Sequence, residues 1–162
     1  MKKVLLFILL IFSANSYAKE ACKRPRWKIV YNENLKCKMY YNHYILYNTS
    51  NRKPEIERKN GFCKVIKGHW KVKSYSGDVS VYYASDLNID HILPYSYIVK
   101  QVGCKEAKKY FNLKYNLEPL EANYNKSKKD NVCHNKEYCL KQKLICLKIE
   151  EEFKKSLNCK NL

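Results

Sequence analysis

Eight cysteines constrain this chain more than any other feature of its sequence, and all of them lie after residue 18. They are Cys22, Cys37, Cys63, Cys104, Cys133, Cys139, Cys146 and Cys159. No two of them have the C-x2-C spacing that is common among zinc ligands. An even number of cysteines in a small exported chain predicts a disulfide framework, so we expect four bonds, while the spacing alone does not select the pairing.

The first 18 residues have the layout of a secretory signal peptide. A positive start at Met1–Lys3 precedes the apolar run Val4–Phe12, and small residues lead to Ala18. A membrane anchor is the alternative, but spanning a bilayer takes about 20 apolar residues, which is more than this run supplies. We therefore expect cleavage near Ala18, a secreted or periplasmic protein, and no membrane association afterwards.

The chain is strongly basic, with 32 Lys and Arg against 15 Asp and Glu among 162 residues. Removal of residues 1–18, which include Lys2 and Lys3, would lower the formal net charge from +17 to +15. Such a field favours polyanions: nucleic acid, an anionic membrane surface or acidic glycans. Charge alone does not choose among them, and a merely solvated surface is the alternative. The length suggests one domain, and we expect a monomer.

The patterning predicts an α+β fold in three parts after the signal peptide. Residues 19–60 are expected to form an N-terminal extension packed on the core, with a loop or short helix at 48–60. Residues 61–130 should form the core, and residues 131–162 a C-terminal helix. Within the core, extended segments are predicted at 62–66, 68–72, 79–84, 87–94 and 115–120, and helices at 96–111 and 121–129.

The segment 137–157 has the periodicity of an amphipathic helix that covers the core. The apolar residues that recur near helical spacing are Leu140, Leu144, Leu147 and Phe153. This helix also carries Cys139 and Cys146, so we expect disulfide bonds to hold it to the body of the protein.

Asp90, His91 and Asn125 carry the functional groups that phosphodiester hydrolysis needs. The reaction needs a base for water and a cation that neutralises charge on the phosphate. A histidine with a pKa near ~6.5 suits the base, and carboxylate and amide oxygens suit Mg²⁺ while leaving places for water. The alternation of Leu87, Ile89 and His91 puts Asp90 on the opposite strand face, so a local bend would have to bring the two side chains to one site.

Three segments together resemble the HNH nucleases: D-H-I-x-P at 90–94, N-L-x-P-L at 116–120 and N-x-x-K at 125–128. The upstream Gly68-x-Trp70 and Tyr75-Ser76-Gly77 are similar to segments of exported HNH proteins. The resemblance covers about residues 61–130. It implies a ββα-metal core, in which a β-hairpin and a helix hold one metal ion, with flanking helices and disulfides. The endonuclease I-like proteins are the second choice, because their acidic ligand is usually glutamate.

The resemblance also implies roles for individual residues. His91 would be the general base, and Asn116 would tie the loop and orient the histidine. Asp90 and Asn125 would bind one divalent cation, with Mg²⁺ favoured and Mn²⁺, Ca²⁺ or Zn²⁺ as alternatives. Lys128 and, more weakly, Lys126 would contact phosphate. The sequence departs from the family pattern at Lys129, where many relatives have glycine. Asn123 is the alternative to Asn125 as the metal ligand.

These features support two hypotheses. The first is a metal-dependent endonuclease that cuts DNA, or RNA as well, with little sequence specificity. The second is a non-enzymatic, cationic, disulfide-rich secreted binding protein or toxin. The second explains the charge and the cysteines equally well, but it does not explain the three motif segments. His43, His69 and His134 are expected to be surface or structural residues, and Trp70 is expected in the core.

Overall fold

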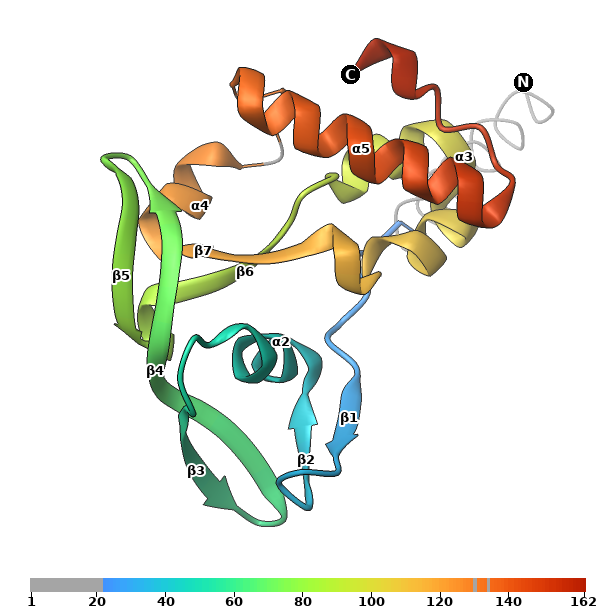
Figure 1. Ribbon diagram of the computed structural model, residues 1–162. Coiled ribbons are helices and arrows are strands. Elements are labelled where there is room, and N and C mark those ends of the chain that lie inside the picture. Colours follow the sequence, from blue (N-terminus) through green and yellow to red (C-terminus); the bar gives the residue numbers. More distant parts are fainter. Residues whose placement is uncertain (1–21, 130, 134) are drawn as a thin grey trace, which may run out of the picture.

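The computed structural model describes residues 22–129, 131–133 and 135–162 of the chain, so the predicted signal peptide lies outside the described residues. Within these described residues the fold is α+β, as expected, with a five-stranded sheet, a separate two-stranded sheet and four α-helices. Figure 1 shows the larger sheet with helix α2 at one end of the molecule and helices α3 and α5 at the other, with the strands β6 and β7 between them.

The five-stranded sheet contains the segment that we expected to be an extension. Its strands are β1 (Ile29–Asn32), β2 (Cys37–Tyr40), β3 (Glu55–Lys59), β4 (Phe62–Ser74) and β5 (Gly77–Tyr83). The order is β1-β2-β4-β3, and β5 pairs with β4. All pairs are antiparallel except β2 with β4, which is parallel. The strands β1, β2 and β3 therefore share one sheet with the proposed core.

Two expectations change at the hairpin of β3 and β4: residues 55–59 of the expected loop or short helix at 48–60 form a strand, and the expected boundary at residue 61 lies in the turn of this hairpin. Asn60 and Gly61 join these strands with φ values of 51° and 76°. Asn-Gly is the sequence that two-residue hairpin turns favour, because both residues must adopt positive φ. The strand β3 therefore occupies residues expected to be loop, and the expected boundary falls inside a turn.

Helix α2 (Tyr41–Thr49) packs against this sheet, where its Leu46 meets Trp70 of β4. The Trp70 ring is 1% exposed, and its indole N–H donates to the Leu46 carbonyl at 3.1 Å. A Cβ at Gly68 would lie 2.5 Å from the Trp70 ring. The Gly68-x-Trp70 segment is therefore explained by packing, and the expectation of a core role for Trp70 is confirmed.

The two-stranded sheet consists of β6 (Leu87–His91) and β7 (Leu117–Glu121), which run antiparallel with Asp90 opposite Glu118 and His91 opposite Leu117. Helix α4 (Ala122–Lys128) follows β7 directly. It begins where the Glu121 carboxylate accepts hydrogen bonds from two main-chain N–H groups, as helix N-caps do. It ends at Lys129, whose φ of 52° is a conformation that glycine adopts at lower cost.

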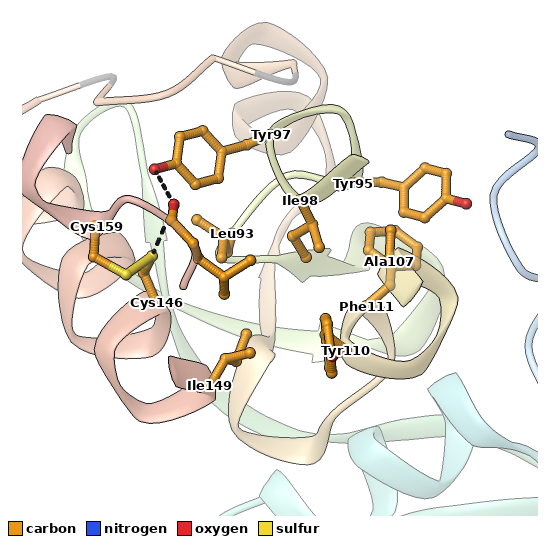
Figure 2. Packing of buried hydrophobic residues seen from close by; sticks show 11 residues of the cluster. Leu93, Tyr95, Tyr97, Ile98, Ala107, Tyr110, Phe111, Cys146, Ile149 and Cys159 are labelled. Carbon is orange, nitrogen blue, oxygen red and sulfur yellow. Dashed lines mark hydrogen bonds between the residues drawn. A yellow bond between two sulfur atoms is a disulfide. The ribbon is translucent and has the colours of Figure 1, made fainter. Parts of the chain in front are cut away.

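The helical end of the molecule has its own hydrophobic core, built from α3 (Tyr95–Phe111), α5 (Lys136–Phe153) and the C-terminal segment. Figure 2 shows Ile98, Tyr110 and Ile149 in this cluster. Helix α3 is interrupted at Gly103, where φ is 76°. Among the described residues, no helix combines the length and the apolar character needed to cross a membrane.

The buried face of α5 differs from the expected one except at Phe153, which packs against the core of the helical end. Leu140, Leu144 and Leu147 are 57%, 67% and 45% exposed. The residues that α5 buries are instead Tyr138, Gln142, Cys146 and Ile149. Because both sets recur at helical spacing, the periodicity predicted the helix but not the side that faces the core.

Four disulfide bonds include all eight cysteines, as the sequence predicts. The pairs are Cys22–Cys104, Cys37–Cys63, Cys133–Cys139 and Cys146–Cys159. Such a framework is typical of proteins from oxidising compartments. The two bonds of α5 close loops within residues 131–162, so the expectation that disulfides link this helix to the body is wrong. Buried side chains make that attachment instead.

Candidate functional site

The predicted site residues gather around the antiparallel strand pair β6 and β7, which lies between α2 and α5 (Figure 1). Side chains of neighbouring strand residues point to opposite faces of a sheet. The face that carries Asp90 and Glu118 meets α5, and the face that carries Ile89 and Leu117 meets α2. The site therefore has two sides with different chemistry.

His91 ends β6 and lies between two aromatic rings. Its imidazole stacks on Phe111 with ring centroids 3.5 Å apart and on Trp27 with centroids 5.2 Å apart. Its Nε2 lies 2.9 Å from the side-chain Oδ1 of Asn112. A carbonyl oxygen only accepts, so Nε2 donates the hydrogen in this contact.

Asn116 is completely buried and holds the chain that follows His91. Its Oδ1 accepts from the Leu93 N–H at 2.7 Å, and its Nδ2 donates to the carbonyls of Leu93 and Phe111. Its main-chain carbonyl accepts from the Ile92 N–H at 2.9 Å. Gln142 of α5 adds a hydrogen bond from its Nε2 to the Ile92 carbonyl. These bonds fix the backbone on which the imidazole sits.

Asp90 lies in a buried ionic cluster under α5. Its Oδ2 is 3.0 Å from the Nζ of Lys128 and accepts a hydrogen bond from the Tyr138 hydroxyl. Asp90 and Lys128 are 7% and 1% exposed. The Lys128 ammonium also lies 4.4 Å from the centre of the Tyr138 ring. On the same face, Glu118 pairs with Lys141 at 3.1 Å.

Burial dominates the electrostatics of this cluster. Loss of water raises the pKa of Asp90, although the Lys128 ammonium and the Tyr138 hydroxyl act in the opposite direction. Burial, together with the nearby Asp90 charge, raises the pKa of Tyr138. The tyrosine hydroxyl therefore stays protonated and remains the donor in its hydrogen bond with Asp90.

The donor set around Asp90 does not fit a divalent cation in this arrangement. An ammonium and a hydroxyl already satisfy the one buried carboxylate, and Lys128 occupies the cationic position next to it. Within the part of the chain that the structure describes, no three His, Cys, Asp or Glu side chains cluster as metal ligands would.

The other proposed ligand, Asn125, lines a cavity of about 500 Å³ on the α2 side. The cavity lies between α2, β4 and the start of β6, and Trp27 forms part of its wall. Because the Trp27 ring also stacks on His91, the imidazole lies one ring away from this cavity. The structure thus places Asn125 on the cavity and Asp90 in the cluster under α5.

The two proposed phosphate-binding lysines of α4 differ in position. Lys126 is exposed, so its ammonium can meet a ligand at the surface. Lys128 is buried against Asp90, so the expectation that its side chain faces a phosphate is wrong for this arrangement. The alternative ligand Asn123 is exposed at the start of the same helix.

Asn112, Phe111 and Trp27 contact His91, and sequence reasoning did not single them out. Asn112 follows the expected helix 96–111 directly, so an asparagine at a helix end was the available signal. Trp27 comes from a segment without a motif, about 60 residues before the histidine, and no local pattern could have placed it there. Comparison of the chain with protein-family models, curated proteins and solved structures found no match.

Proposed function

We propose that this chain is an exported nuclease of the HNH type that hydrolyses phosphodiester bonds in DNA or RNA. The observation that carries the proposal is the order of three motif segments. β6 ends at His91, β7 begins directly after Asn116, and α4 carries Asn125. An antiparallel strand pair followed directly by a helix is what a ββα core requires. The helices α3 and α5 are then the flanking helices.

His91 would act as the general base, with its imidazole oriented by the contact between Nε2 and the Asn112 amide oxygen. The imidazole takes a proton from water as the water oxygen bonds to phosphorus. The ester bond between phosphorus and the leaving oxygen breaks, and the leaving oxygen takes a proton from solvent water, giving one strand that ends in phosphate and one that ends in a hydroxyl. Asn116 keeps His91 in place by fixing the chain at Leu93. Because Asp90 is already paired with Lys128, we derive no step through a metal ion.

Binding of the substrate would rest mainly on charge. The chain carries a formal net charge of +17, and Lys126 is exposed on α4 next to Asn125. Contacts between lysines and phosphates give binding without sequence preference, and their strength falls steeply with salt. We therefore expect DNA and RNA to bind more weakly as salt rises.

The test is cleavage of plasmid DNA and of RNA by the purified, disulfide-bonded chain and by the variant His91→Ala. Loss of a general base lowers rates by about 10²–10⁴-fold, so the variant should leave both substrates intact. His69→Ala is the matched control, because His69 is also a partly buried histidine but lies on β4. Intact substrates with the unmodified chain, both in Mg²⁺ and in EDTA, would contradict the proposal.

The same assay addresses the metal. Cleavage that stops in EDTA would mean that the reaction needs a divalent cation, which Asp90 could help to hold only if its carboxylate separated from Lys128. Cleavage that continues in EDTA would mean that the reaction needs no divalent cation and that the Lys128 ammonium next to Asp90 is sufficient positive charge for it. A cationic binding protein remains the second candidate, and the closed cluster of Asp90, Lys128 and Tyr138 favours it. That candidate predicts salt-dependent binding of nucleic acid without any cleavage.

A further inference from the structure

A second pocket, separate from the cavity beside Trp27, collects positive charge where β3 begins. It measures about 250 Å³, and its lining includes Arg52, Lys53 and Lys67, so we call it the basic pocket. All three cations are exposed, and none of them forms an ion pair with a carboxylate in the described part of the chain. Glu55 is the one acidic residue among those that line the pocket. The basic pocket therefore has an excess of positive charge that an anionic group would neutralise.

Main-chain hydrogen bonds hold the three cations at one place. The His69 N–H donates to the Ser50 hydroxyl oxygen at 3.0 Å, and the Asn51 N–H donates to the His69 carbonyl at 2.8 Å. These bonds tie the segment before β3, which carries two of the cations, to the part of β4 that carries Lys67. The pairing of β4 with β3 and with β5 shifts register in the same region, and such bulges redirect side chains. The fold itself thus brings these charges together.

Tyr82 of β5 adds an aromatic ring to the same pocket. It belongs to the lining and is 51% exposed. The next residue, Tyr83, is 56% exposed, and the centre of its ring lies 5.8 Å from the Lys67 ammonium. Exposed rings among cations are the combination with which proteins bind single strands, because bases stack on the rings while the cations meet phosphates.

We infer that the basic pocket binds a single-stranded stretch of nucleic acid, with the three cations on its phosphates and the Tyr82 ring against a base. The inference rests on the proposed function and adds to it a substrate-binding surface outside the ββα core. A duplex offers phosphates but keeps its bases stacked on one another, and an acidic glycan offers charge but no base. Only a single strand therefore uses both the cations and the ring.

The position of the basic pocket suits a strand that also reaches His91. After Tyr83 the chain passes through one short helical turn (Ala84–Asp86) directly into β6, which ends at His91. His91 lies eight positions after Tyr83, so the two are at most about 29 Å apart. Phosphates repeat about every 3.4 Å along a strand of duplex, so about 20 nucleotides are long enough to contact both places.

The experiment is the binding of a fluorescently labelled single-stranded oligonucleotide of about 20 nucleotides, followed by anisotropy over a series of salt concentrations. The disulfide-bonded chain carries His91→Ala, so that the strand stays intact. Adding Arg52→Ala, Lys53→Ala and Lys67→Ala together should weaken binding about tenfold, because contacts to phosphates are lost. The slope of log affinity against log salt should become shallower by about 2, because each phosphate contact on a single strand contributes about 0.7.

The matched control combines Lys100→Ala, Lys105→Ala and Lys108→Ala. It removes the same charge from exposed positions on α3, at the other end of the molecule (Figure 1). Its affinity and its salt slope should stay close to those of the His91→Ala chain. An equal loss of affinity in both triple variants would overturn the inference, because the overall charge and not the basic pocket would then bind the strand.

Tyr82→Ala tests the stacking of a base. It should weaken binding of the single strand by at least about fivefold and leave binding of a duplex of the same length unchanged. Tyr31→Ala is its control, because Tyr31 is 50% exposed but lies on β1, and it should change neither affinity. Single-strand binding that Tyr82→Ala does not weaken, or an equal loss for the duplex, would contradict the inference.

Two further measurements separate this surface from its alternatives. Heparin binding that depends on the basic pocket, with oligonucleotide binding independent of it, would assign the surface to an acidic glycan and overturn the inference. Oligonucleotide binding through the basic pocket, without strand cleavage by the unmodified chain, would support the surface and contradict the nuclease. Cleavage by the unmodified chain, with oligonucleotide binding that neither the triple variant nor Tyr82→Ala changes, would support the nuclease and contradict the surface.

Discussion

The two sides of β6 differ in the charge of the polar groups that they bury. Under α5, the Asp90 carboxylate meets an ammonium and a hydroxyl and is closed from solvent. On the α2 side, Asn42 and His43 leave buried atoms without partners around an open cavity. Charged pairs in the first case fasten a helix to the strands, although Oε1 of Glu118 there is also buried without a partner, whereas the second side has neutral polar side chains next to a cavity. One short strand thus separates a charged structural cluster from a cavity lined by neutral polar and apolar residues and Lys64.

Among the substitutions that test this comparison, Lys128→Ala should have the largest effect, which is a loss of folding stability. Removing one partner of a buried ion pair typically costs about 3–5 kcal/mol, because the other charge is left buried without compensation. The free energy of unfolding, measured with denaturant and intact disulfides, should fall by that order. Lys126→Ala is the control on the same helix; it is exposed and should change stability by no more than about 0.5 kcal/mol.

The loss of stability in Lys128→Ala should itself depend on pH. Burial raises the pKa of Asp90, and the variant would lose the ammonium that counteracts the rise. A carboxyl whose folded pKa is raised favours the folded state while it is protonated, and this contribution is lost as pH rises through the folded pKa. The defect of Lys128→Ala should therefore be smaller in acid than at neutral pH. Equal stability of the two lysine variants at all pH values would show that the cluster is not structural.

Asn112→Leu should disturb the other face with little effect on folding. It removes the hydrogen bond to Nε2 of His91, so the imidazole loses its fixed orientation and tautomer. We expect cleavage to slow by about 10–100-fold, because small misplacements of reacting groups lower rates by that order. The pH–rate profile should shift as well, which a purely structural role would not cause. Asn112→Gln, which keeps an amide oxygen, should recover part of the rate.

The smallest effect is expected from His43→Gln, which should change only part of the pH dependence of folding stability. Burial and Lys64 lower its pKa below the ordinary value of 6.5, so the unfolded chain takes up a proton at this position more readily than the folded one. Stability should then decrease as pH falls below about 6.5. In His43→Gln this part of the pH dependence should be missing. A variant whose melting temperature falls in acid as steeply as that of the unmodified chain would mean that His43 is not held neutral.

Local patterns predicted much of the central region. The ends of β6, β7 and α4 lie within a few residues of the expected ones, because Pro94 and the changes in periodicity mark them. The hairpin of β3 and β4 was missed although Asn60-Gly61 is a strong turn signal. The buried face of α5 could not be chosen, because Leu144 and Ile149 belong to two apolar stripes of one period.

The sequence by itself determined that the eight cysteines form disulfide bonds and that the chain is basic. It also contained the motif residues Asp90, His91, Asn116 and Asn125. These follow from composition and from spacing along the chain. Only the tertiary structure decided that Lys128 pairs with Asp90, that Trp27 and Phe111 enclose His91, and that Asn125 borders a cavity. The reason is physical: burial and pairing depend on which distant segments pack together, and a local pattern does not contain that information.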